Sequence, residues 1–327
     1  MKFGKVPTKD AGGALLAHSV ALPKGRLRKG LCLDGAHIDQ LLAAGVDEIT
    51  VAQLAAGDVD ENTAAGQLAQ ALLADHPHLS QTKPFTGRVN LLADGPGVAV
   101  LDVKALEAVN SVHPMITLAT VPPFQQMASG GMVATIKIIS YAVDQSDLAS
   151  ACAAGRGAIR LANPQLSDAT LIITEIERGA GDKGREAIAD RLTALNVTLK
   201  KVVMVPHKTP ALRDAITAAD TSLILILTGS ATSDIDDVAP SALRDAGGQV
   251  ARFGMPVDPG NLLFLGNLGE KHVIGLPGCA RSPALNGADW VLSRVICGIE
   301  VTPADIAGMG VGGLLKEIAT RPQPRRG

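Results

Sequence analysis

Residues 223–227 read Leu-Ile-Leu-Ile-Leu, an apolar run of strand length that is typical of a strand buried on both faces of a sheet. Comparable runs occupy residues 169–173 and 201–205. Segments with the apolar spacing of a helix lie between the runs, at residues 184–195 and 210–219. This alternation predicts a mostly parallel sheet with helices on both faces, in which ligands bind at the carboxyl ends of the strands.

The alternation continues toward the C-terminus with a helix over residues 237–246 and a strand over residues 249–253. A further helix is expected from about Ser282. We place this α/β domain at residues 149–300. The residues after it, 301–327, end in an Arg- and Pro-rich stretch and are expected to form a solvated C-terminal tail.

The N-terminal half has a different pattern. Helical spacing predicts a helix over residues 36–44, and alternating polar and apolar residues predict a strand over residues 47–54. Asp60 stands where it can cap a second helix. Residues 88–143 are rich in β-branched residues and turns, which favours strands. We therefore expect an N-terminal α+β domain at residues 1–148.

Composition excludes several classes of protein. The chain has 327 residues, 46% of them hydrophobic, which is enough for roughly two domains with apolar cores. A formal net charge of −2 and a content of five Phe, one Tyr and one Trp argue against a nucleic-acid partner. The four cysteines form no C-x-x-C motif, and no apolar run approaches membrane-span length. We expect a cytoplasmic protein with reduced thiols and no membrane partner.

Small hydroxylated residues follow the apolar run at 223–227. Thr228, Gly229, Ser230 and Thr232 lead into the start of a helix, where backbone N–H groups and the helix dipole favour a bound phosphate. Three carboxylates, Asp234, Asp236 and Asp237, end this loop and supply the oxygen ligands that Mg²⁺ prefers. The alternative is that Asp236 or Asp237 caps the helix and the rest is a solvated turn.

A second glycine-containing loop follows a short apolar strand near residue 273. It reads Gly275-Leu276-Pro277-Gly278-Cys279-Ala280-Arg281-Ser282, and Pro259-Gly260 lies upstream of it. Such a loop offers backbone donors to an anion, although an ordinary turn ahead of a helix explains it as well. Glu175 and Asp182 follow the first apolar run and are candidates for the same cleft, with a surface loop as the alternative.

Together these residues resemble the molybdopterin-binding domain shared by molybdopterin adenylyltransferases and molybdopterin molybdenumtransferases, over residues 169–295. The N-terminal half is similar to that of the molybdenumtransferases. The resemblance implies molybdopterin as ligand, Mg²⁺ as cofactor and molybdate as substrate. Residues to which it assigns cofactor binding are Thr228, Gly229, Ser230, Thr232, Pro259, Gly260, Gly275, Pro277, Gly278, Cys279 and Ser282. It implies catalytic roles for Asp237 and Asp182, and a metal held by Asp237, Asp236 and Glu175.

The chain departs from this family at several positions. Ser230 stands where a second loop glycine is common, and its Cβ restricts how closely backbone approaches a phosphate. Asn261 replaces a lysine, which removes a cation. Cys279 replaces an asparagine and Ala280 a proline.

Two functions follow from the resemblance and these departures. The first is molybdopterin binding with insertion of molybdate into adenylylated molybdopterin, as in a molybdenumtransferase. The alternative is a carrier or chaperone that holds the cofactor for a molybdenum enzyme without nucleotide chemistry. A different nucleotide or sugar-phosphate enzyme on the same fold is the third interpretation. A small pterin ligand, a molybdenum enzyme as partner and a homo-oligomer are expected.

Overall fold

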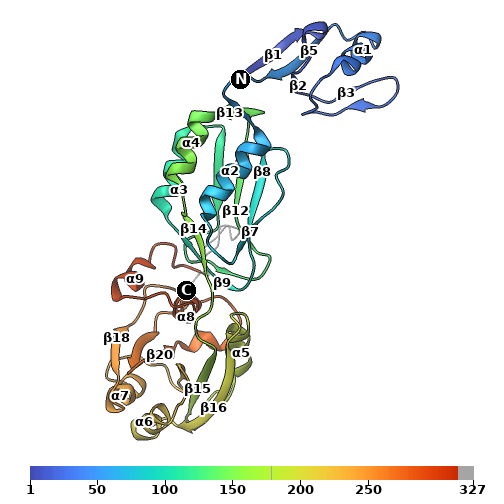
Figure 1. Cartoon of the computed structure of the whole chain (residues 1–327). Helices are drawn as coiled ribbons and strands as arrows, with labels where there is room; N and C mark the ends of the chain where they lie inside the picture. The colour runs from blue at the N-terminus through green and yellow to red at the C-terminus, as the bar shows by residue number, and fades with distance from the viewer. Residues whose placement is uncertain (178, 316–327) are drawn as a thin grey trace. The chain divides into compact units, whose positions relative to one another are not determined.

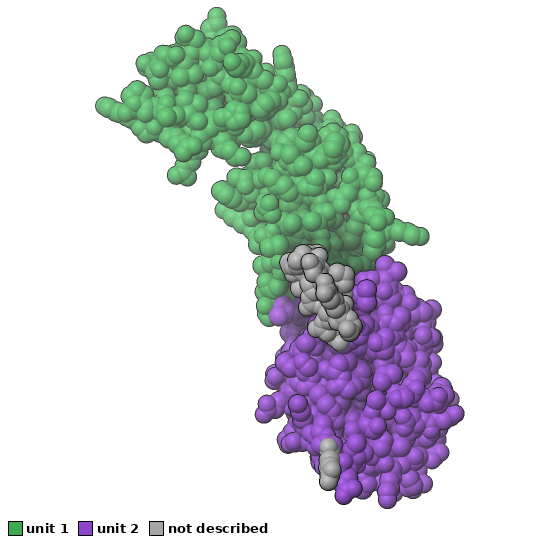
Figure 2. Space-filling view, turned by 180° about the vertical axis from the view of Figure 1, so that it is seen from behind, with its two compact units in different colours: residues 1–94, 99–123, 129–161 green, residues 95–98, 124–128, 162–327 purple. Residues whose placement is uncertain are grey.

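The computed structural model describes residues 1–177 and 179–315. These residues form two compact units, which are coloured separately in Figure 2. Unit 1 comprises residues 1–94, 99–123 and 129–161, and unit 2 comprises residues 95–98, 124–128 and the described residues from 162 onward. No helix in the described ranges is long and apolar enough to cross a membrane.

Unit 1 is built on small antiparallel sheets. The first has the order β1-β5-β2 and is made of β1 (Lys2–Pro7), β5 (Glu48–Gln53) and β2 (Leu15–Leu16). The short strands β3 (Val20–Ala21) and β4 (Arg26–Leu27) pair with each other, and helix α1 (Gly35–Ala43) follows β4. The second has the order β10-β12-β8-β7, made of β10 (Ile116–Thr120), β12 (Met132–Ile138), β8 (Arg88–Ala93) and β7 (Leu79–Gln81). A two-stranded pair joins β6 (Asp58–Asp60) to β13 (Ala142–Asp144).

The helices of unit 1 begin where the sequence offers caps. Asp60 caps α2 (Glu61–Leu73) through the N–H groups of Asn62 and Thr63, as expected. Asp102 caps α3 (Val103–Val112), and Asp144 caps α4 (Gln145–Ala154). The predicted helix over residues 36–44 and strand over residues 47–54 are confirmed, and the expected N-terminal α+β architecture is observed.

Unit 2 contains a six-stranded sheet of order β16-β15-β17-β20-β19-β18 (Figure 1). Its strands are β15 (Asp168–Glu175), β16 (Thr198–Pro206), β17 (Leu223–Leu227), β18 (Gln249–Phe253), β19 (Phe264–Leu268) and β20 (Lys271–Leu276). Strands β16, β15, β17 and β20 are parallel, whereas β19 is antiparallel to both of its neighbours. A tight turn between β19 and β20 forces this reversal. The mostly parallel sheet is confirmed.

Helices cover both faces of this sheet. Helices α6 (Thr209–Thr217) and α7 (Val238–Asp245) pack on one face through a cluster that includes Ile172, Ile224 and Phe264. All residues of β17 are fully buried, so the opposite face is covered as well. Helices α5 (Arg185–Thr193), α8 (Gly287–Ile296) and α9 (Pro303–Gly308) complete the unit.

Two segments from the N-terminal half belong to unit 2. Strand β11 (Gln126–Met127) pairs with the first residues of β9 (Gly97–Leu101), and β9 also borders β14 (Ile159–Ala162). The guanidinium of Arg294 lies 3.9 Å from the ring centroid of Phe124. Unit 2 therefore includes residues 95–98 and 124–128 in addition to the residues from 162 onward.

The structure corrects the helix expected from Ser282. Residues Gly278–Arg281 form a short 3₁₀ turn, and α8 begins only after Asn286, whose side chain accepts from the Ala288 N–H. Carbonyls that a helix from Ser282 would have used point instead to Arg191.

The expected tail is partly structured. Residues 303–308 form α9, capped by Thr302, with Ile306 buried. Residues 316–327 of the expected tail lie outside the described residues.

Candidate functional site

The four parallel strands end at one edge of the sheet. Register pairs Glu175 with Pro206, Ile173 with Leu227, and Leu227 with Leu276. The loops after β15, β16, β17 and β20 therefore start side by side. This confirms that the loops after Ile173 and Leu227 are neighbours, and it places the candidate ligand loops at the edge where parallel sheets bind ligands.

Thr174 joins three of these loops. It is 1% exposed at the end of β15, and its Oγ1 accepts a 2.9 Å hydrogen bond from the Gly229 N–H. The same oxygen lies 2.8 Å from Nδ1 of His207, the first residue after β16. A buried hydroxyl that bonds both neighbours fixes the start of the β17 loop relative to β15 and β16.

Gly229 is required by this packing. A Cβ at position 229 would lie 2.7 Å from the carbonyl oxygen of Thr174 and 3.2 Å from the nitrogen of Ile176. Backbone atoms cannot yield that much space, so a side chain does not fit. Ser230 is exposed, and its larger side chain is accommodated at the surface.

The threonines of the β17 loop shape the loop itself. Oγ1 of Thr228 donates to the carbonyl oxygen of Ser230 at 2.6 Å and lies 3.3 Å from Oγ1 of Thr232. Thr232 is buried, at 6% exposure. These hydroxyls hold the loop in the conformation that presents its backbone and Ser230 at the edge of the sheet.

The aspartates at the end of this loop make local contacts. Asp237 caps α7, with Oδ1 accepting from the Val238 N–H at 2.7 Å and Oδ2 accepting from the Ser233 N–H at 3.0 Å. Asp236 pairs with Arg244 at 2.8 Å. Asp234 accepts a 2.8 Å bond from the Asp236 N–H. Asp237 therefore makes the capping contact, Asp236 makes an ion pair, and Asp234 makes a contact within the turn.

The three carboxylates to which the resemblance assigns a metal have different surroundings. Glu175 is exposed at the end of β15, and Asp236 and Asp237 are engaged as described. Among the described residues, no group of three or more His, Cys, Asp or Glu side chains is placed to hold a metal ion. Mg²⁺ usually keeps several waters and is bound through one or two carboxylates together with substrate phosphates, so a metal at Asp236, Asp237 and Glu175 stays a prediction.

Pro259 and Gly260 are buried against the start of α8. The Gly287 N–H donates to the carbonyl oxygen of Pro259 at 2.8 Å, and a Cβ on Gly260 would lie 2.8 Å from the Gly287 nitrogen. The pair thus positions the first turn of α8. Asn261 is exposed, and its Nδ2 donates to the carbonyl oxygen of Met255 at 3.2 Å.

Gly275 is a core glycine. It lies within β20, and a Cβ there would lie 1.9 Å from Cε1 of Phe264, which is itself fully buried. Pro277 is also buried. Gly278 differs, because it is exposed and an added Cβ would meet no described atom within 4 Å. Among Gly229, Gly260, Gly275 and Gly278, an added Cβ therefore finds open space at Gly278 alone.

Arg191 holds the loop that follows β20. Its guanidinium donates to the carbonyl oxygens of Ala280, Ser282 and Ala284 at 3.0, 2.8 and 3.0 Å, and forms a 2.5 Å ion pair with Asp289. Its side chain is 12% exposed. This arginine fixes the backbone around Cys279, which is half-buried, and leaves Ser282 exposed.

Arg281 bridges the loops after β15 and β17. It donates to the carbonyl oxygens of Gly181 and Lys183, which flank Asp182, and to the carbonyl oxygen of Thr228 at 2.9 Å. Within the described part of the chain it forms no ion pair, and burial lowers the pKa of its guanidinium. Gly184 packs directly on it, since a Cβ there would lie 2.7 Å from the Arg281 Cα.

The structure thus divides the expected site residues into two groups. Those of the loops after β15, β17 and β20 come together at the carboxyl edge, with Asp182, Ser230, Gly278 and Ser282 exposed. Gly260 and Gly275 are closely packed, against Gly287 and Phe264 respectively. The sequence analysis did not identify Arg191 or Arg281 as site residues. For Arg281, the available signal was its position as a basic residue within the small-residue loop at 275–282.

Comparison with known families assigns this part of the chain. Residues 169–295 match the family described as "Probable molybdopterin binding domain". Residues 5–53 match a family described only as a domain of unknown function. No curated protein matches the chain.

Several solved structures are similar at low identity. A molybdopterin biosynthesis MoeA protein from Pyrococcus horikosii is 14% identical, with 91% of this chain and 75% of that chain covered and a TM-score of 0.32. The molybdopterin biosynthesis enzyme MoaB from Thermus thermophilus is 19% identical, with 40% and 89% covered and a TM-score of 0.29. A molybdenum cofactor biosynthesis protein from Pyrococcus furiosus is 12% identical, with 92% and 66% covered and a TM-score of 0.26.

The α/β architecture of unit 2 and the domain match define the class: a protein with a molybdopterin-binding-type α/β domain. The match to the probable molybdopterin binding domain covers residues 169–295, which is less than half of the chain. With TM-scores of 0.32 or less, the solved structures do not support the assignment, which depends on the domain match at residues 169–295.

Proposed function

We propose that the carboxyl edge of the unit 2 sheet binds molybdopterin through its phosphate and pterin. The observation that carries this proposal is Arg281, a half-buried guanidinium between two loops of a molybdopterin-binding-type domain, with no carboxylate partner in the described ranges. An arginine in a partly desolvated position attracts an anionic oxygen more strongly than it would in bulk water. Phosphate is the anionic group that molybdopterin offers.

Arg281 retains donors for such a ligand. Its guanidinium has five N–H groups, and the described contacts are to three carbonyl oxygens. Positive charge at this edge also comes from Lys208, which is exposed after β16. These groups compensate for the lysine that the resemblance expects at Asn261.

Replacing Arg281 with methionine is expected to weaken molybdopterin binding by about tenfold or more, since a charge-assisted hydrogen bond is lost. Binding of dephosphorylated molybdopterin should be unchanged. Anaerobic titration of both ligands, monitored by pterin fluorescence, measures the difference. Arg213→Met serves as the control, because Arg213 is an arginine of α6 paired with Asp214. An equal loss for both ligands would mean that Arg281 only shapes the loop.

The finer proposal concerns what happens to the bound cofactor. Insertion of molybdate into adenylylated molybdopterin is the molybdenumtransferase reaction, in which Asp237 and Asp182 would be the acidic groups near the reacting phosphate. The carrier alternative is favoured by one observation: the carboxylates of Asp236 and Asp237 are already occupied by capping and ion-pair contacts. A carrier would deliver the loaded cofactor to a molybdenum enzyme, and assembly as a homo-oligomer remains part of either proposal.

Release of AMP separates these two functions. If the chain is a transferase, wild-type protein supplied with adenylylated molybdopterin, molybdate and Mg²⁺ releases AMP, whereas Asp237→Asn does not. Asparagine is a good helix cap, so this variant keeps α7 and removes the charge. The measurement is chromatographic quantitation of AMP over time. Tight pterin binding by wild type without AMP release supports the carrier instead.

A further inference from the structure

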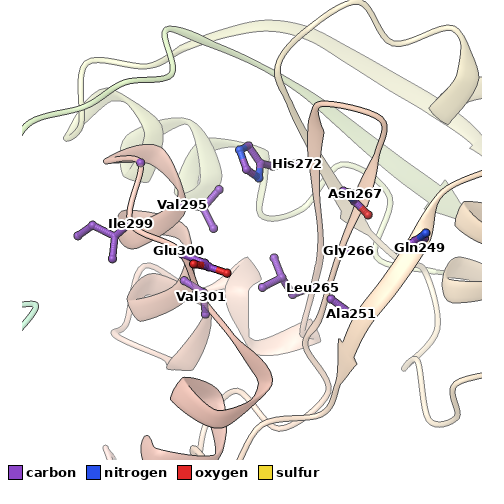
Figure 3. A pocket seen from close by; sticks show the side chains of 11 residues that line it. Gln249, Ala251, Leu265, Gly266, Asn267, His272, Val295, Ile299, Glu300 and Val301 are labelled. Carbon is purple, nitrogen blue, oxygen red and sulfur yellow. The ribbon is translucent and has the colours of Figure 1, made fainter.

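A cavity of about 450 Å³ lies in unit 2 (Figure 3). It lies near the start of β20, whereas the candidate site lies at the end of that strand. Gln249, Asn267 and His272 are consecutive partners in register across β18, β19 and β20 and line one side. The end of α8 and residues 298–301 line the other side. His272 is near the start of β20, and Leu276 ends it, roughly 13 Å further along the strand.

The cavity has an apolar floor and a polar rim. Leu265, Val295 and Val301 are 7%, 5% and 9% exposed and form apolar walls. Figure 3 shows the Glu300 side chain directed into the space between these walls. No hydrogen bond or ion pair from the described residues engages the side chains of Glu300 or His272.

The charge of the lining is one-sided. Glu300 is its single acidic residue, and the lining contributed by the described residues includes no lysine or arginine. Glu300 is exposed in the free protein, so water screens its carboxylate until a ligand covers the apolar walls beside it. A ligand whose apolar body covers Leu265, Val295 and Val301 displaces that water and strengthens the pairing of the carboxylate with a cation. An anionic ligand would be repelled, and a purely apolar one would cover Glu300 without satisfying its oxygens.

We propose that this cavity binds a small organic cation that has an apolar body and a planar N–H donor group. The apolar body contacts Leu265, Val295 and Val301, and the donor group pairs with the Glu300 carboxylate. The volume lies within the range of small-molecule sites. The site is separate from the carboxyl edge, where the available charge favours anions.

Benzamidine tests the proposal, since its amidinium presents two N–H groups to a carboxylate and its ring is apolar. Benzamide, a neutral compound of nearly the same shape, is the matched ligand control. The full chain should bind benzamidine by calorimetry, and benzamide at least about tenfold more weakly. Equal binding of the two compounds, or no binding of benzamidine, overturns the proposal.

Two variants locate the binding. Glu300→Gln should weaken benzamidine binding by about tenfold or more, whereas Glu270→Gln, at an exposed glutamate in the turn between β19 and β20, should not change it. Ala251→Leu fills the cavity from β18 and should abolish binding in a protein whose Trp290 fluorescence is unchanged. Unchanged affinity in Glu300→Gln or Ala251→Leu overturns the proposal. Molybdopterin binding should be the same in Glu300→Gln and wild type.

Discussion

Replacing Arg191 with methionine is expected to lower the free energy of unfolding of unit 2 by about 3–5 kcal/mol. The guanidinium is nearly buried and forms an ion pair with Asp289. It also donates to the carbonyl oxygens of Ala280, Ser282 and Ala284. Methionine fills the volume but leaves the carboxylate and these carbonyls without their donor, which is the costly way to break a buried ion pair.

The chain contains one tryptophan, Trp290, next to Asp289 in α8, so its fluorescence during urea unfolding reports on this unit. Arg185→Met, at an exposed position in the first turn of α5, is the matched control and should shift stability by less than about 0.5 kcal/mol. The double variant Arg191→Met with Asp289→Asn should lose less than the two single variants together, because the unpaired charge is removed. Strict additivity would contradict the ion pair's role.

Replacing Gly275 with alanine is expected to destabilise unit 2 by about 3 kcal/mol or more. The new Cβ would lie 1.9 Å from the ring of Phe264, which is fully buried between β19, β20 and α7. Either the ring or the strand must move, and a packed core resists both. Urea unfolding monitored at Trp290 measures the effect. Gly278→Ala, where the Cβ meets open space, is the matched control.

A rescue experiment tests the cause. Phe264→Leu alone should destabilise the unit by creating a cavity, but combined with Gly275→Ala it should be less harmful than the sum, since the ring that meets the new Cβ is gone. The folded double variant should bind molybdopterin with wild-type affinity, because Gly275 acts in the core. Loss of pterin binding in the folded double variant would mean that Gly275 takes part in ligand binding.

Local sequence patterns were sufficient for much of the fold. The apolar run at residues 223–227 predicted a strand covered on both faces, and β17 is buried along its whole length. Asp60 predicted a helix start, and its carboxylate caps α2. Both predictions succeed because strand burial and helix capping depend on residues within a few positions of each other.

The helix expected from Ser282 was wrong for the opposite reason. Its carbonyls are taken by Arg191, 91 positions away in the sequence. No local pattern indicates such a partner, so the start of α8 at Gly287 follows from tertiary contacts. The helix propensity of a segment is overridden when distant side chains form hydrogen bonds with the carbonyl oxygens that the helix would have used.

The candidate site shows the same division. Sequence alone determined the alternation of strands and helices, and with it the edge of the sheet at which the loops after β15, β17 and β20 meet. Tertiary structure decided which glycines serve packing, Gly229 against Thr174 and Gly275 against Phe264, and which leaves open space, Gly278. It also decided that Arg281 is the cation between the loops. The physical reason is the sequence separation of the interacting residues. Hydrophobic periodicity and helix caps depend on residues a few positions apart, whereas steric exclusion and buried hydrogen bonds involve residues that only the completed fold brings together.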